Sequence, residues 1–273
     1  MVKVSVIMTF FNESESLLKR SVDSILNQTF QDFEFIIIAG NPENSPAIDY
    51  LKTLSSEQKK ILFHVADSKL RMATCLNWAI RLASGKYIAI QESDDASFRE
   101  RLERELYFME QDDRIDIMGT SIAYINDADQ KHIVTRYYPE HPRKAFNKYT
   151  AIAHPTILVK RELYEKYGYY NENEEVRNSP DHELWCRWII QGVRFFNIPD
   201  VLFNYYQSAE NGRNKNAKKT LRSVVRLKTM YATQMKFTFS DYIYLWMEKS
   251  LLLLPQSIIS KVFYVWIRFK RVR

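Results

Sequence analysis

The chain has 273 residues, of which 46% are hydrophobic and 14% aromatic, enough apolar material for one large α/β domain with an appended segment. Its two cysteines, Cys75 and Cys186, match neither a metal-ligand spacing nor a disulfide framework, which excludes a disulfide-rich secreted domain and leads us to expect reduced thiols. The formal net charge of +6 includes a C-terminal stretch, residues 261–273, that has basic residues and no acid, which favours nucleic acid or an anionic membrane surface as a partner.

Predicted strands and helices alternate through the first part of the chain. Runs of β-branched residues predict buried strands, and apolar residues at helical spacing, such as Leu18, Val22 and Ile25, predict helices. The predicted strands are 2–8, 33–38, 61–65 and 87–90, and the predicted helices cover 18–26, 47–54 and 73–83. This alternation favours an α/β fold with a mostly parallel central sheet flanked by helices, in which ligands bind beyond the carboxyl ends of the strands.

The second part of the chain reads as mixed strands and helices. A helix containing Leu102, Leu106 and Met109 precedes a strand near residues 115–124, and the mixture continues to about Tyr206. The polar, basic segment 210–219 suggests a boundary, after which helices continue to the end. The N-terminal run is too short and too soon charged for a signal peptide, so we expect a cytoplasmic protein.

The C-terminal tail has no apolar run of about 20 residues, so we do not expect it to cross a bilayer. A predicted helix fits an orientation in the plane of a membrane interface; the alternative is a helix packed on the main domain with a solvated basic end. Its apolar residues are Ile258, Ile259, Val262, Phe263, Trp266 and Phe269, and its basic residues, mostly off that face, are Lys261, Arg268, Lys270, Arg271 and Arg273.

An acidic cluster, Glu92-Ser93-Asp94-Asp95, follows the predicted strand 87–90. Carboxylates this close repel one another, and a hard cation such as Mg²⁺ or Mn²⁺ relieves the repulsion while also binding a diphosphate. The alternative is a solvated loop in which Asp94 or Asp95 caps a helix that begins near residue 98. The six glycines make a Gly-rich phosphate loop hard to build, which disfavours kinase and dinucleotide-binding functions.

A second acidic position is Asp181, at the predicted start of a helix after a polar run. Its placement suits either a helix N-cap or a general base that deprotonates an acceptor hydroxyl, and spacing alone favours the cap. The scattered histidines show no metal-ligand spacing. His154 begins an apolar run and would either face a site or pack as a structural residue.

Several motifs in register resemble family 2 glycosyltransferases. They are the run Val4 to Glu13, the run Ser24 to Phe30 followed by residues 32–38, the run Leu76 to Ile80, the run Ala83 to Ala89, and Asp181-His-Glu-Leu-Trp-Cys-Arg187. The resemblance covers residues 1–207. It implies a GT-A fold and an inverting transfer from a nucleoside-diphosphate sugar, UDP in the first instance, as in bacterial cell-surface polysaccharide synthesis.

The resemblance also assigns roles to individual residues. Asp181 becomes the catalytic base, and Asp94 or Asp95 becomes the ligand of Mn²⁺ or Mg²⁺, with Glu92 in place of the usual first Asp of an Asp-X-Asp-like motif. The residues implied to lie at the donor nucleotide are Thr9, Phe10, Phe11, Asn12, Glu13, Asn41, Asn77, Glu92 and Ser93.

One departure concerns the segment after the second strand, where the family commonly has an acid that contacts the nucleobase. This chain has Asn41 and Glu43 there instead. The departure keeps open an alternative function, a non-catalytic GT-A-like module that binds a nucleotide or a partner protein.

The resulting domain prediction is a GT-A catalytic domain at 1–207 and a helical C-terminal extension at 208–273 that associates with the membrane. Within the catalytic domain, residues 1–98 form the nucleotide-binding half and 99–207 the acceptor-binding half. The expected acceptor is a saccharide or a lipid-linked glycan, the expected location is the inner face of the cell membrane, and nucleic acid is not expected as a partner.

Overall fold

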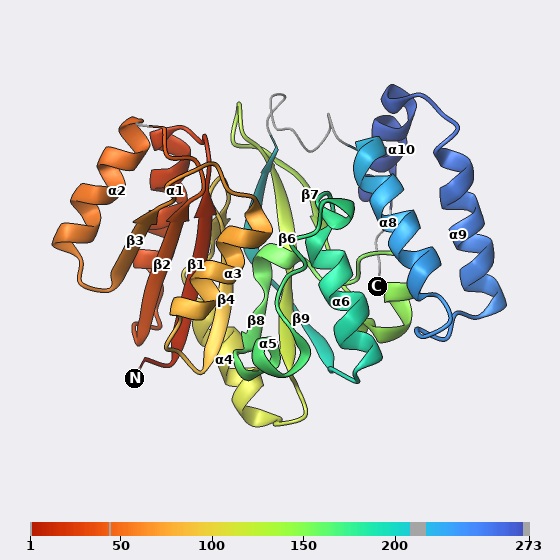
Figure 1. The fold of residues 1–273 in the computed structure, drawn as a ribbon, viewed down its shortest axis with the longest axis horizontal. Coiled ribbons are helices and arrows are strands. Elements are labelled where there is room, and N and C mark those ends of the chain that lie inside the picture. Colours follow the sequence, from red (N-terminus) through yellow and green to blue (C-terminus); the bar gives the residue numbers. More distant parts are fainter. Residues whose placement is uncertain (1, 44, 208–216, 270–273) are drawn as a thin grey trace.

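The centre of the molecule is a nine-stranded β-sheet covered by helices (Figure 1). The computed structural model describes residues 2–43, 45–207 and 217–269, with 263–269 as backbone. The strands are β1 (Val4–Phe10), β2 (Phe33–Ala39), β3 (Ile61–Val65), β4 (Tyr87–Glu92), β5 (Ala96–Ser97), β6 (Ile117–Asn126), β7 (His132–Arg136), β8 (Leu158–Lys160) and β9 (Phe195–Gln207). The α-helices are α1 (Glu15–Leu26), α2 (Pro46–Glu57), α3 (Met72–Leu82), α4 (Arg101–Gln111), α5 (Glu162–Tyr167), α6 (Pro180–Ile190), α8 (Ala217–Tyr231), α9 (Phe239–Leu251) and α10 (Gln256–Phe269), and short 3₁₀ helices lie at Pro142–Asn147, His154–Thr156 and Glu174–Val176.

The four N-terminal strands are parallel, in the order β3-β2-β1-β4. Every residue of β1 is buried, which explains why its sequence is mostly apolar, with Ser5 and Thr9 as its polar residues. Strands β1, β2 and β3 are each followed by a helix that returns the chain to the start of the next strand, and α2 begins with Ser45 as N-cap and Pro46 in its first turn. This half of the sheet is therefore the doubly wound unit that the sequence predicts.

Beyond β4 the sheet is mixed. The short strand β8 is antiparallel to both β4 and β6, whereas the long strand β9 runs parallel to β6 over almost its whole length. The longest pairings in the sheet are thus parallel, and the antiparallel ones are short. The complete order is β3-β2-β1-β4-β8-β6-β9-β5, with β7 paired to β6.

Two apolar cores lie on the two faces of the sheet. On one face, Trp185 and Trp188 of α6 pack with Leu76 of α3. On the other face, Leu18 of α1 and Leu106 of α4 pack in a second cluster with alternate residues of β1 and β2. The fold is a three-layer α/β/α arrangement.

The helices α8, α9 and α10 lie beside the sheet, with α9 at the outer edge of the molecule (Figure 1). Met235, which follows α8, joins the same apolar core as Trp185, and Tyr231 of α8 donates a hydrogen bond to Glu183 of α6. Within the described ranges, no helix has both the length and the apolarity that a membrane crossing requires. The predicted interfacial side chains Phe263, Trp266 and Phe269, and the basic residues from 268 onward, lie outside the described side chains.

Candidate active site

The ends of β1, β2 and β4 meet at one edge of the sheet, as their parallel pairing requires. In the pairing register, Thr9 lies opposite Glu92 and Phe10 lies opposite Ala39. Residues that follow these strands are therefore brought together although they are far apart in the sequence. Thr9 and Ser93 are both buried.

The amide of Asn41 connects the ends of β1 and β2. Its Nδ2 donates to Oδ1 of Asn12 over 2.6 Å and to Oε2 of Glu43 over 3.2 Å. The carboxylate of Glu13 accepts from the backbone N–H groups of Phe11 and Asn12 at 2.8 and 3.0 Å. A loop with amide and carboxylate groups fixed in this way has the hydrogen-bonding groups that a nucleobase or ribose needs.

Gly40 makes this junction sterically feasible. A Cβ atom at position 40 would lie 2.4 Å from the ring of Phe11 and 2.8 Å from the Sγ atom of Cys75. Both atoms belong to packed side chains, so the chain can turn toward Asn41 only with glycine at this position.

The acidic turn after β4 is held by the half-buried side chain of Arg20 and the buried side chains of Ser21 and Gln91. Arg20 of α1 donates to the carbonyl of Asp94 at 2.8 Å, and Ser21 donates to the carbonyl of Glu92 at 2.7 Å. The Nε2 atom of Gln91 donates to the carbonyl oxygens of both Glu92 and Asp95. These bonds fix the backbone of the turn without using its carboxylates.

The two adjacent aspartates of this turn have different environments. Asp95 has 0% exposure, and its Oδ1 accepts the backbone N–H of Tyr206 on β9 at 2.8 Å. Asp94 is partly exposed. Neither residue caps a helix, because the helix expected near residue 98 begins at Arg101 with Glu100 as its N-cap. The capping interpretation of this cluster is therefore wrong.

Glu92 lies at the end of a chain of side chains that starts at Tyr170. Nε2 of His154 lies 2.8 Å from the hydroxyl of Tyr170, and Nδ1 of His154 lies 3.4 Å from Oε1 of Glu92. Burial raises the pKa of Tyr170 well above its ordinary value, with the neighbouring Tyr164 and the negative charges of Asp181 and Glu92 adding to the effect. The Tyr170 hydroxyl therefore keeps its proton, and the tautomer of the imidazole decides which atom donates in its contacts with Tyr170 and Glu92.

Asp181 faces the same cavity as Glu92 and His154. It lies in the first turn of α6, after the N-cap Ser179 and Pro180, so the interpretation of Asp181 as the helix cap is wrong. The cavity has a volume of about 390 Å³. Its lining consists of Met72, Glu92, Ile122, Tyr124, Tyr138, Thr150, Ile152, Ala153, His154, Pro155, Arg177, Asn178, Pro180, Asp181 and Tyr205.

Asn77 fixes the segment that leads to Asp181. Its amide donates to the carbonyl of Tyr170 and to Oε1 of Glu172, and its Oδ1 accepts from the N–H of Tyr170. Thr74, one turn earlier on α3, also donates to Glu172. The side-chain amide of Asn77 is therefore hydrogen-bonded to this loop, and it holds the loop in place.

The oxygen ligands that a hard divalent cation prefers are present at this edge as the carboxylates of Glu92 and Asp94. Within the part of the chain that the structure describes, however, no group of three or more His, Cys, Asp or Glu side chains is arranged to hold a metal ion. The donor set fits a cation only if further ligands come from a bound substrate.

Comparison with known proteins identifies the family. The model of glycosyl transferase family 2 matches residues 5–168. The chain belongs to this family, and it is a glycosyltransferase. It is 32% identical over 249 residues to an uncharacterized glycosyltransferase of Methanocaldococcus jannaschii, covering 89% of this chain and 83% of the relative. It is 31% identical over 206 residues to the O-antigen biosynthesis glycosyltransferase WbnJ of Escherichia coli, covering 74% of this chain and 78% of WbnJ.

Solved structures confirm the GT-A fold of this glycosyltransferase. S. aureus TarS in complex with UDP-GlcNAc superposes with a TM-score of 0.67 at 15% identity, over 84% of this chain and 66% of that one, so the present chain spans just under two thirds of the TarS structure. The mannosyltransferase PcManGT of Pyrobaculum calidifontis, in complex with GDP-Man and Mn²⁺, superposes with a TM-score of 0.64 at 15% identity, over 97% of this chain and 73% of PcManGT.

Three site residues carry too weak a sequence signal to be predicted. Arg20 and Gln91 hold the acidic turn, and Tyr170 orients His154. Arg20 lies at a polar position of a helix, and Gln91 is the first residue of the polar run 91–95, where nothing local separates it from its neighbours. Their importance depends on pairings between distant segments, which no local spacing reveals.

Proposed function

We propose that this glycosyltransferase transfers a sugar, with inversion at the anomeric carbon, from a nucleoside-diphosphate donor to a hydroxyl group of a saccharide acceptor. The observation that carries the proposal is that Asp181 lines one cavity together with Glu92 and His154. A carboxylate across a cavity from the acidic turn is positioned to act on the acceptor rather than on the donor phosphates.

The chemistry assigned to Asp181 is general base catalysis. The acceptor oxygen forms a bond to the anomeric carbon while the bond from that carbon to the diphosphate oxygen breaks. Asp181 takes the proton of the acceptor hydroxyl, and the nucleoside diphosphate leaves. Displacement in a single step inverts the configuration at the anomeric carbon.

Asp94 is the proposed protein ligand of a divalent cation, Mn²⁺ or Mg²⁺. Its partial exposure favours it over Asp95, whose carboxylate is engaged with Tyr206. Mg²⁺ and similar ions commonly bind through one or two carboxylates plus substrate phosphates, and this is the composition that the edge offers. When bound, the ion neutralises charge on the leaving diphosphate.

The donor nucleoside is proposed to lie between the ends of β1 and β2. Asn12 and Asn41 meet there, with the ring of Phe11 beside Gly40. An amide both donates and accepts hydrogen bonds, unlike the acid common at this position in the family. UDP is the first candidate, and GDP is the second.

The acceptor is proposed to be a polysaccharide or a lipid-linked glycan handled at the inner face of the cell membrane. WbnJ, the relative named for O-antigen biosynthesis, favours a cell-surface polysaccharide. The structure favours a membrane surface because α9 presents an exposed apolar face: Phe239, Tyr242, Ile243, Trp246 and Met247 recur at helical spacing and are 46 to 82% exposed.

The experiment that tests the transfer measures release of nucleoside diphosphate from UDP, GDP, CDP and dTDP sugars with Mn²⁺, in wild type and in Asp181→Asn. We expect one donor to be hydrolysed or transferred by the wild type. In Asp181→Asn, turnover should fall by at least about 10²-fold while donor affinity stays within about twofold, because the base acts only in the chemical step.

The matched control is Asp49→Asn, since Asp49 also lies in the first turn of a helix but belongs to α2 and is exposed. Turnover retained in Asp181→Asn would refute the assignment of the base. Retention of the donor's anomeric configuration in the product, read by NMR, would refute the inverting mechanism.

A further inference from the structure

A separate cavity, with a volume of about 530 Å³, opens at the start of β9. Phe195 and Phe196, the first residues of β9, line it, whereas Tyr205 near the end of the same strand lines the cavity that contains Asp181. The strand from Phe196 to Tyr205 spans roughly 30 Å. We call the cavity at the start of β9 the distal cavity, and a small ligand bound in it does not touch Asp181.

Three arginines line the distal cavity, and two of them are paired with acids. Arg114 donates from Nε and Nη2 to the two carboxylate oxygens of Asp112, each at 2.9 Å. Arg194 donates from Nε to Oδ2 of Asp116 at 3.1 Å. Among the described residues, the third arginine, Arg143, is in no ion pair, so its positive charge is the one that the lining leaves uncompensated.

The guanidinium of Arg143 is held by neutral oxygens. Its Nη1 donates to Oδ1 of Asn147 at 3.4 Å, and its Nη2 donates to the carbonyl of Met235 at 3.1 Å. Burial lowers the pKa of Arg143, and Cys186 and Asp241 oppose this effect only in part. The carboxylate of Asp241 is itself engaged, because it accepts a hydrogen bond from Asn147 at 3.0 Å.

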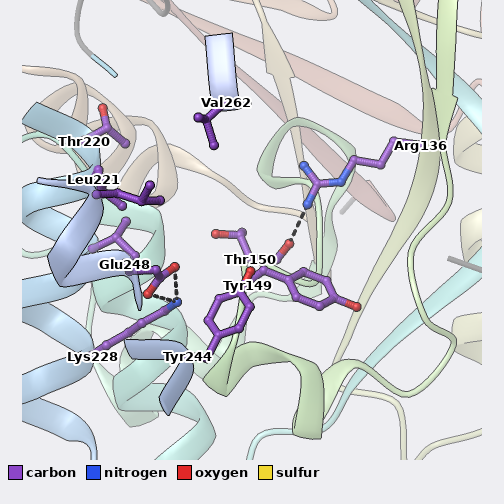
Figure 2. Close-up of a pocket in the computed structure, with 11 residues that line it drawn as sticks. Arg136, Tyr149, Thr150, Thr220, Leu221, Lys228, Tyr244, Glu248 and Val262 are labelled. Carbon is purple, nitrogen blue, oxygen red and sulfur yellow. Dashed lines mark hydrogen bonds and ion pairs between the residues drawn. The ribbon is translucent and has the colours of Figure 1, made fainter. Parts of the chain in front are cut away.

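Lys228 of α8 shows how a buried cation is usually accommodated. Its Nζ lies 2.8 Å from both carboxylate oxygens of Glu248 of α9 (Figure 2). A charge withdrawn from water is normally neutralised in this way, because desolvation of an unpaired charge is unfavourable. Arg143 is half-buried and has no such carboxylate within the described parts of the chain, so a bound anion would complete its environment.

The donors of Arg143 suit a single carboxylate. A guanidinium has five N–H groups, and the bonds to Asn147 and Met235 use one on each terminal nitrogen. The N–H of Nε and the second N–H of each terminal nitrogen remain. Arginine binds a carboxylate through two parallel N–H···O bonds, which these groups can form. One uncompensated positive charge also matches a carboxylate better than the nearly double charge of a phosphate monoester.

Aromatic rings line the same cavity as this charge. The rings of His141 and Phe196 lie edge to face, with their centres 5.4 Å apart. Phe196 is only half-buried, so part of its ring is accessible. The face of an aromatic ring carries partial negative charge and attracts the C–H groups of a sugar ring. A cavity with aromatic walls and one well-placed charge has the composition of a small-molecule site.

We propose that the distal cavity binds an acidic sugar unit, a pyranose that carries a carboxylate, within the glycan on which this enzyme acts. Arg143 binds the carboxylate, and Phe196 contacts the ring. This inference rests on the proposed saccharide acceptor and specifies that it contains acidic units. Because the distal cavity is remote from Asp181, only an extended glycan occupies both places, and its affinity increases through two points of attachment.

A purely structural role for Arg143 predicts a different result. If the guanidinium only joins the 3₁₀ helix at Pro142–Asn147 to the carbonyl of Met235, its removal lowers the free energy of unfolding, and the wild type shows no preference for an acidic sugar. The preference between acidic and neutral sugars is therefore the quantity to measure.

The experiment titrates the full chain, without donor, with methyl β-D-glucuronide and follows binding by NMR. Methyl β-D-glucoside supplies the same ring without the carboxylate, and acetate supplies the carboxylate without the ring. We expect saturable binding of the glucuronide and about tenfold weaker binding of the other two. In Arg143→Gln the affinity for the glucuronide should fall by about tenfold, to the level of the glucoside, as expected for loss of a charge-assisted hydrogen bond.

A variant with the opposite effect tests the proposal even if Arg143→Gln does not fold. Asp112→Asn removes the carboxylate that neutralises Arg114, so a second positive charge becomes available and the glucuronide should bind several-fold more tightly. Phe196→Leu removes the ring and should weaken the glucuronide and the glucoside alike. Arg99→Gln removes an exposed arginine that is not part of the lining and should change neither.

Equal binding of glucuronide and glucoside by the wild type would overturn the proposal, as would a preference that survives in a folded Arg143→Gln. Tighter binding of glucose 6-phosphate than of the glucuronide would assign the cavity to a phosphate instead. Asp181→Asn should bind the glucuronide as the wild type does, and weaker binding there would place the sugar at Asp181 and overturn the proposal.

Failure of the distal site and failure of the proposed transfer give different results. Glucuronide binding that follows the variants as expected, without turnover of any donor, would support the distal site and refute the transfer. Turnover without glucuronide binding would refute only the distal site.

Discussion

The imidazole of His154 connects the hydroxyl of Tyr170 to the carboxylate of Glu92, at 2.8 and 3.4 Å. Since Glu92 pairs with Thr9 at the end of the central strands, this connection links the carboxyl end of β4 to Tyr170, in the segment that precedes α6. His154 is in this sense a positioning residue.

Removing the Tyr170 hydroxyl should disturb that connection. Tyr170→Phe leaves Nε2 of the buried His154 without its hydrogen bond, so we expect the free energy of unfolding to fall by about 1–2 kcal/mol. If the bond orients Glu92 for donor binding, KM for the donor rises several-fold while kcat changes little. Denaturant unfolding and steady-state kinetics measure both effects. Tyr107→Phe, on the exposed face of α4, is the control, and an unchanged KM in Tyr170→Phe would show that the connection is only structural.

The neighbouring residues Asp94 and Asp95 should respond differently to removal. Asp95→Ala leaves the buried N–H of Tyr206 unpaired and should cost about 1–3 kcal/mol of stability. Asp94→Ala should weaken Mn²⁺-dependent nucleotide binding by about tenfold or more, since it removes a charged oxygen ligand. Calorimetric titration of UDP and GDP with and without Mn²⁺ measures the binding. Equal binding in wild type and Asp94→Ala would exclude Asp94 as the ligand.

Stability should depend on pH through His182. Burial, with the nearby charge of Lys228, lowers the pKa of His182 from 6.5 to about 3. Within the described residues, neither ring nitrogen has a hydrogen-bond partner. Between pH 6.5 and 3 the unfolded chain binds a proton that the folded chain does not, so the free energy of unfolding decreases as the pH falls through this window, by up to about 5 kcal/mol.

Substitution of His182 separates this contribution from the rest of the acid response. His182→Leu should retain more of its stability at pH 4 than the wild type does, relative to pH 7. The exposed His132 provides the control His132→Gln, whose pH dependence should follow that of the wild type. Urea unfolding at both pH values makes the comparison, and identical slopes for all three proteins would contradict the prediction.

The apolar face of α9 should bind membranes. Trp246 and Phe239 are 69% and 82% exposed, and the two acids of the C-terminal helices, Asp241 and Glu248, are both engaged with lysines, at 3.8 Å to Lys148 and 2.8 Å to Lys228. We expect sedimentation with vesicles of phosphatidylcholine and phosphatidylglycerol, and about tenfold weaker partitioning for Trp246→Ser, because a large aromatic ring is lost from the interface. Tyr107→Ser removes a similarly exposed ring from α4 and should bind as the wild type does.

The sequence predicts the N-terminal half of the fold well because each element there has its own local signal. The predicted strand 61–65 coincides with β3, and the other three strands end within two residues of their predicted ends. By contrast, β5 and β8 have two and three residues, too few to show any periodicity. The parallel pairing of β9 with β6 joins segments that are far apart in the sequence, and no local pattern specifies it.

In the candidate site, too, residues with a local sequence signal are predictable and residues placed by contacts between distant segments are not. The strand ends identify Glu92 and Asn41 in advance because parallel strands end at one edge. Which of Asp94 and Asp95 turns inward depends on a backbone N–H of β9, and strand periodicity no longer applies within a turn. The position of Asp181 in the cavity could not be predicted either, because it depends on a loop that Asn77 holds through a contact between distant segments.

The hydrogen bonds around the acidic turn also affect the conformational entropy that is lost when a ligand binds there. Arg20 holds the carbonyl of Asp94 and pairs with Asp127, and its guanidinium lies 3.5 Å from the centre of the Tyr206 ring. The backbone of the turn is thus already ordered before a ligand arrives, and binding there costs little conformational entropy. By contrast, residues 174–177, which lie between the loop that Asn77 fixes and Asp181, pair with exposed groups such as Arg71, which contacts Glu174. If Asp181 acts on the acceptor as proposed, we expect the entropic cost of forming the complete site to fall on residues 174–177, and rigidifying this segment to increase the affinity for the acceptor most.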